Sequence, residues 1–384
     1  MDMHSEVNIE QVEPVEKKKK TKKSEGIIYT KPTLSKRELK SVLECMVQDE
    51  ITFGRVVQNL EKEFATSFEF QKAISASSMT SGYHLALLAL NCNVDSEIIL
   101  PANAPVSALD AIGQIGAKPV LVDIAKNSFH PDIESITSLF NDNTRAVLLC
   151  YPYGSFKSYE PLYEYLNSDQ CPSQIKKQVK IIEDISYIAG IEHQGRYVGA
   201  EADIAIIGLD ADMLITTGKG AMVLTDSKTI YSNAKDFRLH GNNRPYKVRY
   251  DYTITDYQAA MGIEQLGNLA QILERRKLIG HKYIEALQNS NLDTFLHNPK
   301  LDSYGQFPII MNNDIEHGLR YFQSLNIEVK RANEYGPLHN LMGLPATEFA
   351  NAERVYQRTL LLPIYPYLTK SNVERIVGAI KSFY

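Results

Sequence analysis

Residues 179–225 read VKIIEDISYIAGIEHQGRYVGAEADIAIIGLDADMLITTGKGAMVLT, and this stretch decides the fold. Its first apolar run, 179–182, ends in two carboxylates, Glu183 and Asp184. A short, continuous apolar run is typical of a buried parallel strand. In open α/β sheets the functional residues lie just beyond the carboxyl ends of such strands. We therefore expect Asp184 at the functional edge of a mostly parallel sheet.

Apolar runs alternate with helix-like stretches from about residue 72 to residue 240. We expect seven strands, at 73–77, 97–100, 119–122, 146–151, 179–182, 205–209 and 221–224. Repeated strand–helix units predict a sheet covered by helices on both faces. An apolar period near 3.6 predicts one long helix over 257–287. Strands at 307–311 and 327–330 and a helix at 371–383 then predict a smaller α+β domain.

The composition of the 384-residue chain is ordinary for a soluble globular protein, with 44% hydrophobic and 23% charged residues. A net charge of −5 gives no general field for nucleic acid. The four cysteines lack metal-binding spacing, so we expect no metal site; Cys92 and Cys150, in apolar surroundings, are expected core thiols. No apolar stretch approaches 18 residues and no secretory leader is visible, so we expect no membrane span and a cytoplasmic location.

Residues 1–26 are polar, with six lysines between Lys17 and Lys23, and we expect a disordered basic tail. Such a tail is most simply a solvated segment without a specific partner. Contact with an acidic lipid surface or nucleic acid is the alternative, because basic clusters attract both.

A colinear series of motifs resembles one enzyme family, the DegT/StrS sugar aminotransferases of pyridoxal 5′-phosphate (PLP) fold type I. The resemblance covers roughly residues 30–384. Besides 179–225, the motifs are ITFGRVVQNLEKEF (51–64), ASSMTSGYHLALLAL (76–90), IILPANA (98–104), GAKPVLVDI (116–124), NTRAVLLCYPYG (143–154), YTITDYQAAMGIEQL (252–266), GPLH (336–339) and LPIYP (362–366).

This resemblance implies the PLP-transferase fold type I. We expect a large, mostly parallel α/β/α sandwich domain over 27–270 and a small C-terminal α+β domain over 271–384. It also implies descent from PLP-dependent nucleotide-sugar aminotransferases of surface polysaccharide synthesis.

The resemblance implies cofactor contacts at Asp184, Ser78, Met79, Thr80, Asn103 and Tyr187. A carboxylate such as Asp184 can hold a protonated pyridine nitrogen, and the alternative is that it caps a neighbouring loop. Hydroxyls at the start of the helix expected near Ser81 can bind a phosphate, and the alternative is simple helix capping.

The family's catalytic positions are substituted. The position of the lysine that forms the Schiff base and moves the proton is Met213, which can do neither. Pro105 replaces the stacking aromatic residue, and Met79 replaces the glycine of the phosphate turn. Further departures are Gly208, Asp210, Lys219, Tyr187, Asp251 and Thr253.

Weak catalytic candidates remain beside the vacant position. Asp210 or Asp212 could act as a base, and Lys219 as a substitute nucleophile, although loop-capping acids and a solvated lysine are the simpler interpretations. The resemblance implies substrate contacts at Arg244, Lys247, Arg249 and His339. Residues 244–249 and 252–266 resemble a loop that in relatives reaches the partner subunit's site, and a solvated basic loop is the alternative for 244–249. We therefore expect a homodimer, or a heterodimer with a lysine-bearing relative.

Two functional hypotheses stay open. The first is a catalytically impaired homologue that binds a nucleotide sugar or serves as a partner subunit. The second is an active transaminase-like or dehydratase-like enzyme that uses PLP, or its pyridoxamine form (PMP), without a covalent bond. In the first case the cofactor itself could be lost.

Overall fold

A seven-stranded sheet forms the centre of the protein, which a computed structural model describes over residues 26–48, 51–239, 246–312 and 314–383. All seven predicted strands are confirmed, and β9 runs antiparallel to both of its neighbours. In spatial order the strands are β1 (Lys72–Ala76), β9 (Ala221–Thr225), β8 (Ile204–Gly208), β5 (Lys180–Asp184), β4 (Thr144–Cys150), β2 (Glu97–Pro101) and β3 (Lys118–Val122).

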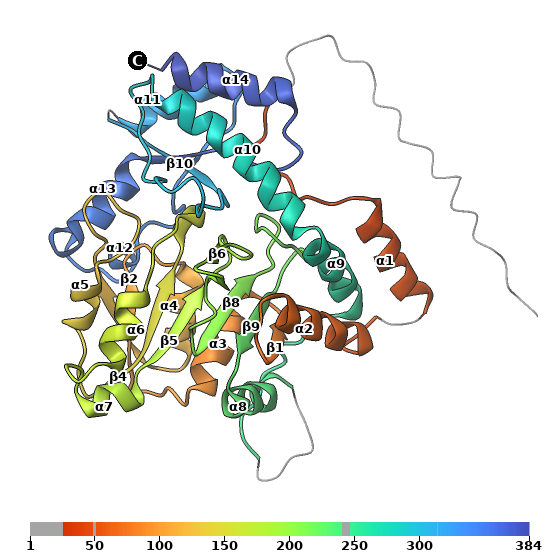
Figure 1. Ribbon diagram of the computed structural model, residues 1–384, viewed down its shortest axis with the longest axis vertical. Helices are drawn as coiled ribbons and strands as arrows, with labels where there is room; N and C mark the ends of the chain where they lie inside the picture. The colour runs from red at the N-terminus through yellow and green to blue at the C-terminus, as the bar shows by residue number, and fades with distance from the viewer. Residues whose placement is uncertain (1–25, 49–50, 240–245, 313, 384) are drawn as a thin grey trace, which may run out of the picture.

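Helices cover both faces of this sheet, as the alternating pattern predicts (Figure 1). One face packs against α3 (Met79–Ala89), α4 (Val106–Gln114) and α8 (Lys228–Arg238). The other face packs against α2 (Arg55–Ser67), α5 (Ile133–Thr137), α6 (Glu160–Asn167), α7 (Ser173–Gln178) and α9 (Asp256–Gly267). The result is the expected three-layer α/β/α sandwich.

The predicted single helix over 257–287 is wrong, because the chain breaks at Asn268 between α9 and α10 (Leu269–Leu287). Asn268 has φ −100° and ψ 0°, outside helical geometry. Gly267 and Asn268 are weak helix formers, and together they end α9. The predicted boundary at 270/271 falls in the first turn of α10.

A three-stranded antiparallel sheet lies at the centre of the C-terminal part, in the order β10 (Phe307–Ile310), β12 (Thr359–Leu362) and β11 (Lys330–Arg331). The strand expected at 327–330 is displaced, since Ile327 instead makes a parallel bridge to Ile27 near the N-terminus. The other helices here are α11 (Ile315–Ser324), α12 (Leu338–Leu341), α13 (Ala350–Arg358) and α14 (Lys370–Lys381).

The remaining elements are short or peripheral. They are α1 (Lys36–Val47), the hairpin of β6 (Glu192–His193) and β7 (Arg196–Tyr197), and the 3₁₀ turns η2 (Pro152–Gly154) and η3 (Ala346–Phe349). Cys92 and Cys150 are buried, as predicted, and so are Cys45 and Cys171. Across the described ranges, every helix is too short or too polar to cross a membrane. The predicted tail lies outside the described residues, except for Gly26.

Sheet register positions the two carboxylates of β5. Asp184 pairs with Cys150, at the carboxyl end of β4, and with Ile206, in the middle of β8. Successive side chains of a strand point to opposite faces. Asp184 therefore lies on the α3 face of the sheet, whereas Glu183 lies on the α6 face.

Candidate active site

Asp184 is buried, and both of its carboxylate oxygens accept hydrogen bonds from the chain. The Tyr83 hydroxyl on α3 donates to Oδ2 over 2.5 Å. The backbone N–H and hydroxyl of Ser186 donate to Oδ1 over 3.0 and 2.5 Å. Ser186 is in turn oriented by the N–H of Gly208, which donates to its Oγ over 2.7 Å. Each carboxylate oxygen therefore already has a donor.

Burial dominates the electrostatics of this cluster. Loss of hydration raises the pKa of Asp184, while the hydrogen bonds from Ser186 and Tyr83 lower it in part. Burial and the neighbouring carboxyl group raise the pKa of Tyr83 well above its usual value. The Tyr83 hydroxyl therefore keeps its proton at neutral pH and acts as the donor to Asp184.

Ser78 is the N-cap of α3, which begins at Met79. Its Oγ accepts from the Ser81 N–H over 3.1 Å, and the Ser81 Oγ accepts from the Ser78 N–H over 2.8 Å. This reciprocal capping box satisfies donors that a phosphate would otherwise bind. Thr80, one residue into the helix, is half-buried.

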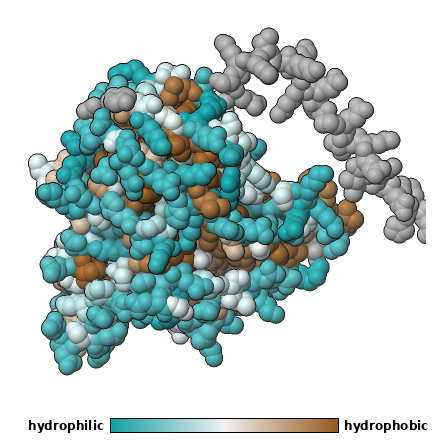
Figure 2. All heavy atoms as spheres, turned by 45° about the horizontal axis from the view of Figure 1, so that its top comes forward, coloured by the Kyte–Doolittle hydropathy of each residue, from teal (hydrophilic) through white to brown (hydrophobic). Residues whose placement is uncertain are grey.

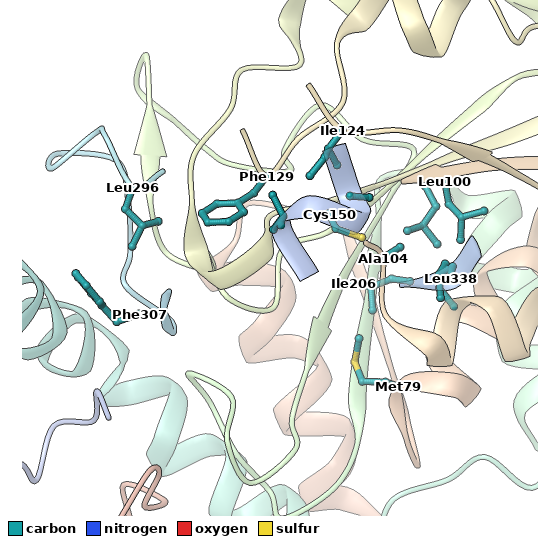
Figure 3. Packing of buried hydrophobic residues seen from close by; sticks show 14 of the residues in the cluster. Met79, Leu100, Ala104, Ile124, Phe129, Cys150, Ile206, Leu296, Phe307 and Leu338 are labelled. Carbon is teal, nitrogen blue, oxygen red and sulfur yellow. The ribbon is translucent and has the colours of Figure 1, made fainter. Parts of the chain in front are cut away.

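Two thioethers meet beside Gly208 on β8. A Cβ placed on Gly208 would lie 2.7 Å from Met79 Sδ and 3.3 Å from Met213 Cε. Met79 is buried in the core, and Figure 3 shows its side chain pointing toward Ile206. Met79 and Met213 thus pack on the same short stretch of β8, next to the Ser186 that holds Asp184.

The weak catalytic candidates lie in different surroundings. Asp212 lines a cavity that also contains Asp184. Asp210 instead accepts a hydrogen bond from the Gly220 N–H over 3.3 Å, and burial raises its pKa. Lys219 is exposed, and its carbonyl accepts from Gln258 Nε2 over 3.2 Å.

The cavity beside Asp184 has a volume of about 390 Å³. It brings together the predicted residues Asp184, Asn103, Tyr187, Pro105 and Asp212; the additional walls are Tyr29, Tyr151, Tyr153, Lys330, Arg331 and Tyr335.

Two side chains of this cavity are held in place by neighbours. Asn103 Nδ2 donates to the Phe129 carbonyl over 2.9 Å, while its buried Oδ1 has no partner among the described residues. Tyr187 accepts from Gln306 Nε2 over 3.1 Å. Asn103 thus keeps an acceptor for a ligand donor.

The predicted substrate residues that the structure describes do not line this cavity. Lys247 and Arg249 both pair with Asp236 on α8. His339 is fully buried, with Nε2 3.1 Å from Glu353 Oε2 and its ring stacked on Phe349. Arg244 lies outside the described residues. Within one described chain, therefore, these side chains contact structural partners.

The sequence analysis missed Tyr83, whose hydroxyl donates a hydrogen bond to Asp184. A signal was available, because residues four apart lie on the same face of a helix and Tyr83 follows Met79 by four. Tyr153 was also missed. It lines the cavity with φ +62°, in the left-handed region that non-glycine residues rarely adopt.

The residues present do not fit PLP bound as the family motif implies. Met213 offers no amine for a covalent bond. The carboxylate meant for the pyridine nitrogen already accepts from Tyr83 and Ser186, and the hydroxyl of Ser78 is used in capping. Met79 and Met213 fill space around Gly208.

Comparisons with known proteins agree with the fold. The model of the "DegT/DnrJ/EryC1/StrS aminotransferase family" matches residues 32–381. The chain is 28% identical to the uncharacterized protein MJ1066 of Methanocaldococcus jannaschii, over 91% of this chain and 96% of that protein. It is 27% identical to GDP-perosamine synthase of Escherichia coli O157:H7, over 92% and 97% of the two chains.

Solved structures are similar over nearly the whole chain. The putative sugar aminotransferase Spr1654 from Streptococcus pneumoniae, in its PLP form, superposes with a TM-score of 0.84 at 21% identity, over 93% of this chain and 98% of that one. Helicobacter pylori PseC, an aminotransferase of pseudoaminic acid biosynthesis, gives 0.80 at 21% identity, over 93% and 98%. From the extent of the family match, this chain belongs to the DegT/DnrJ/EryC1/StrS aminotransferase family.

Proposed function

We propose that this chain is a sugar-aminotransferase homologue that has lost covalent PLP catalysis. In its place the chain binds a nucleotide sugar, alone or as the partner subunit of a lysine-bearing relative. The observation that carries the proposal is the occupation of Asp184 by Tyr83 and Ser186, at a site whose lysine position is Met213. Tyr83 and Ser186 hold Asp184 in place without a cofactor, and Met213 offers no amine for covalent attachment.

The choice of ligand rests on relatives and on the cavity. GDP-perosamine synthase acts in nucleotide-sugar chemistry by its name, and PseC acts in the biosynthesis of a sugar acid. Tyrosine rings, Asn103 and Asp212 line the cavity. Aromatic faces and a few fixed polar groups are what a sugar ring requires.

Two aspartates provide a matched test of nucleotide-sugar binding. Asp212 lines the cavity, whereas Asp210, two residues earlier, does not. Calorimetry with GDP-linked and UDP-linked hexoses should detect binding that Asp212→Asn weakens and Asp210→Asn leaves unchanged. Absence of binding by the wild type to both nucleotide sugars contradicts the ligand assignment.

The loss of PLP chemistry has its own test. Added PLP should give no new visible absorption band, and borohydride reduction should leave cofactor mass on no peptide. PLP affinity, measured by equilibrium dialysis, should be the same for wild type and Asp184→Asn, because Asp184 is already paired. Reductive attachment to the Lys219 peptide, or a large loss of affinity in Asp184→Asn, contradicts the proposal.

An exposed apolar face supports a protein partner. The outer side of α1 carries Leu39, Leu43, Met46 and Val47, all exposed. Figure 2 shows hydrophobic side chains at the edge where α1 lies in Figure 1. Light scattering should give about twice the chain mass if the protein is a homodimer. If the protein is a monomer at high concentration, the heterodimer is the remaining alternative, and it is tested by mixing the protein with a lysine-bearing relative. We also expect a cytoplasmic location, in keeping with four buried cysteines that form no disulfide among the described residues.

The second candidate is an enzyme that uses non-covalent PLP or PMP. The open cavity beside Asp184 favours it, since Spr1654 has been solved in both PLP and PMP forms. Such a cofactor would compete with Tyr83 for Asp184 Oδ2. If so, Tyr83→Phe should strengthen PLP binding markedly, and equal affinity of the two proteins argues against this candidate.

A further inference from the structure

The second carboxylate of the strand-end pair, Glu183, has no part in the site on the α3 face. It is 2% exposed. On the α6 face, the Tyr151 hydroxyl donates to Oε2 over 2.7 Å and the Tyr163 hydroxyl donates to Oε1 over 2.5 Å. An ionised carboxylate has about four acceptor positions. Two of those positions therefore remain for a ligand.

Glu183 lies on the wall of a separate pocket of about 120 Å³, between α6 and the β6–β7 hairpin. One water needs about 10–15 Å³ of such space, so the pocket admits a small organic molecule. Five aromatic side chains line it: Tyr151, Phe156, Tyr159, Tyr163 and Tyr197. Tyr151 also borders the cavity beside Asp184.

The charges around this pocket leave it acidic. Arg196 pairs with Glu201 over 2.6 Å, and Lys157 pairs with Asp132 over 3.7 Å. Glu160 accepts only a neutral hydrogen bond, from Gln194 Nε2 over 3.3 Å, among the described contacts. With the two cations engaged, the carboxyl groups of Glu183 and Glu160 have no cationic partner.

We propose that this pocket binds a small organic ammonium ion, held by the Glu183 carboxylate and the surrounding aromatic rings. Tyrosine and phenylalanine faces attract cations, and aromatic enclosures recognise methylated ammonium groups. A buried carboxylate without a counter-charge is costly, and a bound cation supplies that charge. Consistent with the missing charge, burial raises the pKa of Glu183.

Tetramethylammonium is the probe, because its charge does not change with pH. Its methyl resonances should show saturation transfer from the wild-type protein, and titration should give a saturable affinity. The neutral, similarly shaped tert-butanol should bind at least about tenfold more weakly. Glu183→Gln keeps the shape of the side chain and should lower tetramethylammonium affinity at least about tenfold. Glu164→Gln, an exposed change on α6 next to Tyr163, should leave that affinity unchanged.

Three results would overturn the proposal: equal binding of tert-butanol, unchanged affinity in a folded Glu183→Gln protein, or no saturable binding by the wild type. Should Glu183→Gln fail to fold, intermolecular nuclear Overhauser effects on the wild type decide the matter. Contacts from the methyl protons to tyrosine ring protons of this pocket support the site. Their absence, or contacts elsewhere only, refutes it.

Discussion

Tyr83 and Asp184, 101 residues apart in the chain, share a buried hydrogen bond of 2.5 Å between the phenol and Oδ2. This bond gives a strand-end carboxylate an internal partner. Asp184 is the carboxylate that the family resemblance predicts to face a cofactor, and in this chain it is paired with Tyr83. The pair also makes a stability prediction that needs no ligand.

Removal of the Tyr83 hydroxyl should destabilise the protein. Tyr83→Phe leaves Asp184 Oδ2 buried without its donor, at a cost of about 1–3 kcal/mol in the free energy of unfolding. Tyr304→Phe is the control, because the Tyr304 hydroxyl is buried and has no partner among the described residues. Urea unfolding should show the control unchanged or slightly stabilised; equal effects of the two changes would count against the pair.

The buried ion pair between Arg238 and Glu61 should be sensitive to loss of one partner. Both side chains are almost inaccessible, and Arg238 also donates to the Ser75 carbonyl. Arg238→Met leaves Glu61 without its cation and should cost about 3–5 kcal/mol. Arg196→Met, at the exposed pair with Glu201, should cost less than about 1 kcal/mol. Chemical denaturation of both variants measures the difference.

Gly154 should tolerate no side chain. Its φ is +83°, and a Cβ there would lie 2.0 Å from Ser303 Oγ and 2.7 Å from the Tyr187 carbonyl. Gly154→Ala should therefore lower stability by at least about 2 kcal/mol. Gly113 lies inside α4, and a Cβ added there would have no heavy atom of the described residues within 4 Å apart from its own helix backbone and chain neighbours. Gly113→Ala should therefore raise the stability by about 0.5–1 kcal/mol. Thermal unfolding of the two variants should shift in opposite directions.

Titration of the Asp302 carboxyl group should lower the free energy of unfolding as the pH rises from 4 to 7. Burial raises its pKa to about 6, against the backbone donors of Phe156 and Asn298 that lower it. The folded state holds this proton more tightly than the unfolded chain, so the stabilisation is complete below about pH 4 and disappears as pH rises through 6. The difference between the pKa of Asp302 in the folded and the unfolded state corresponds to about 3 kcal/mol in the free energy of unfolding.

Asp302→Asn removes this titration. The unfolding free energy of the wild type minus that of the variant should therefore fall by up to this amount from pH 4 to pH 7. A constant difference across that range would show that Asp302 titrates normally.

Met213→Lys alone should not recover covalent PLP attachment. A lysine there supplies the amine, but Tyr83 still occupies Asp184 and Met79 still packs beside Gly208. After the Met213→Lys variant is incubated with PLP and reduced with borohydride, mass analysis should find no cofactor on the peptide that contains the introduced lysine. Attachment in the single variant would mean that the surrounding site remains competent and that the other substitutions matter little.

The strands and the three-layer arrangement follow from the sequence pattern, and the methionine at position 213 is read directly from the sequence. Apolar runs of five to seven residues must be buried on both faces, so each of the seven strands follows from local pattern alone. Motif order likewise brought Asp184, Asn103, Tyr187 and Asp212 to one cavity. The chemistry that methionine lacks is a property of the residue, whatever surrounds it.

Only the tertiary structure decided what each polar side chain contacts. Asp184 meets Tyr83, His339 meets Glu353, and Lys247 meets Asp236, because helix packing, and not sequence spacing, sets these distances. The break at Asn268, in contrast, follows from local preference, because Gly267 and Asn268 are weak helix formers. Buried polar groups must find partners within the fold, and that requirement converted a predicted cofactor carboxylate into one paired within the chain.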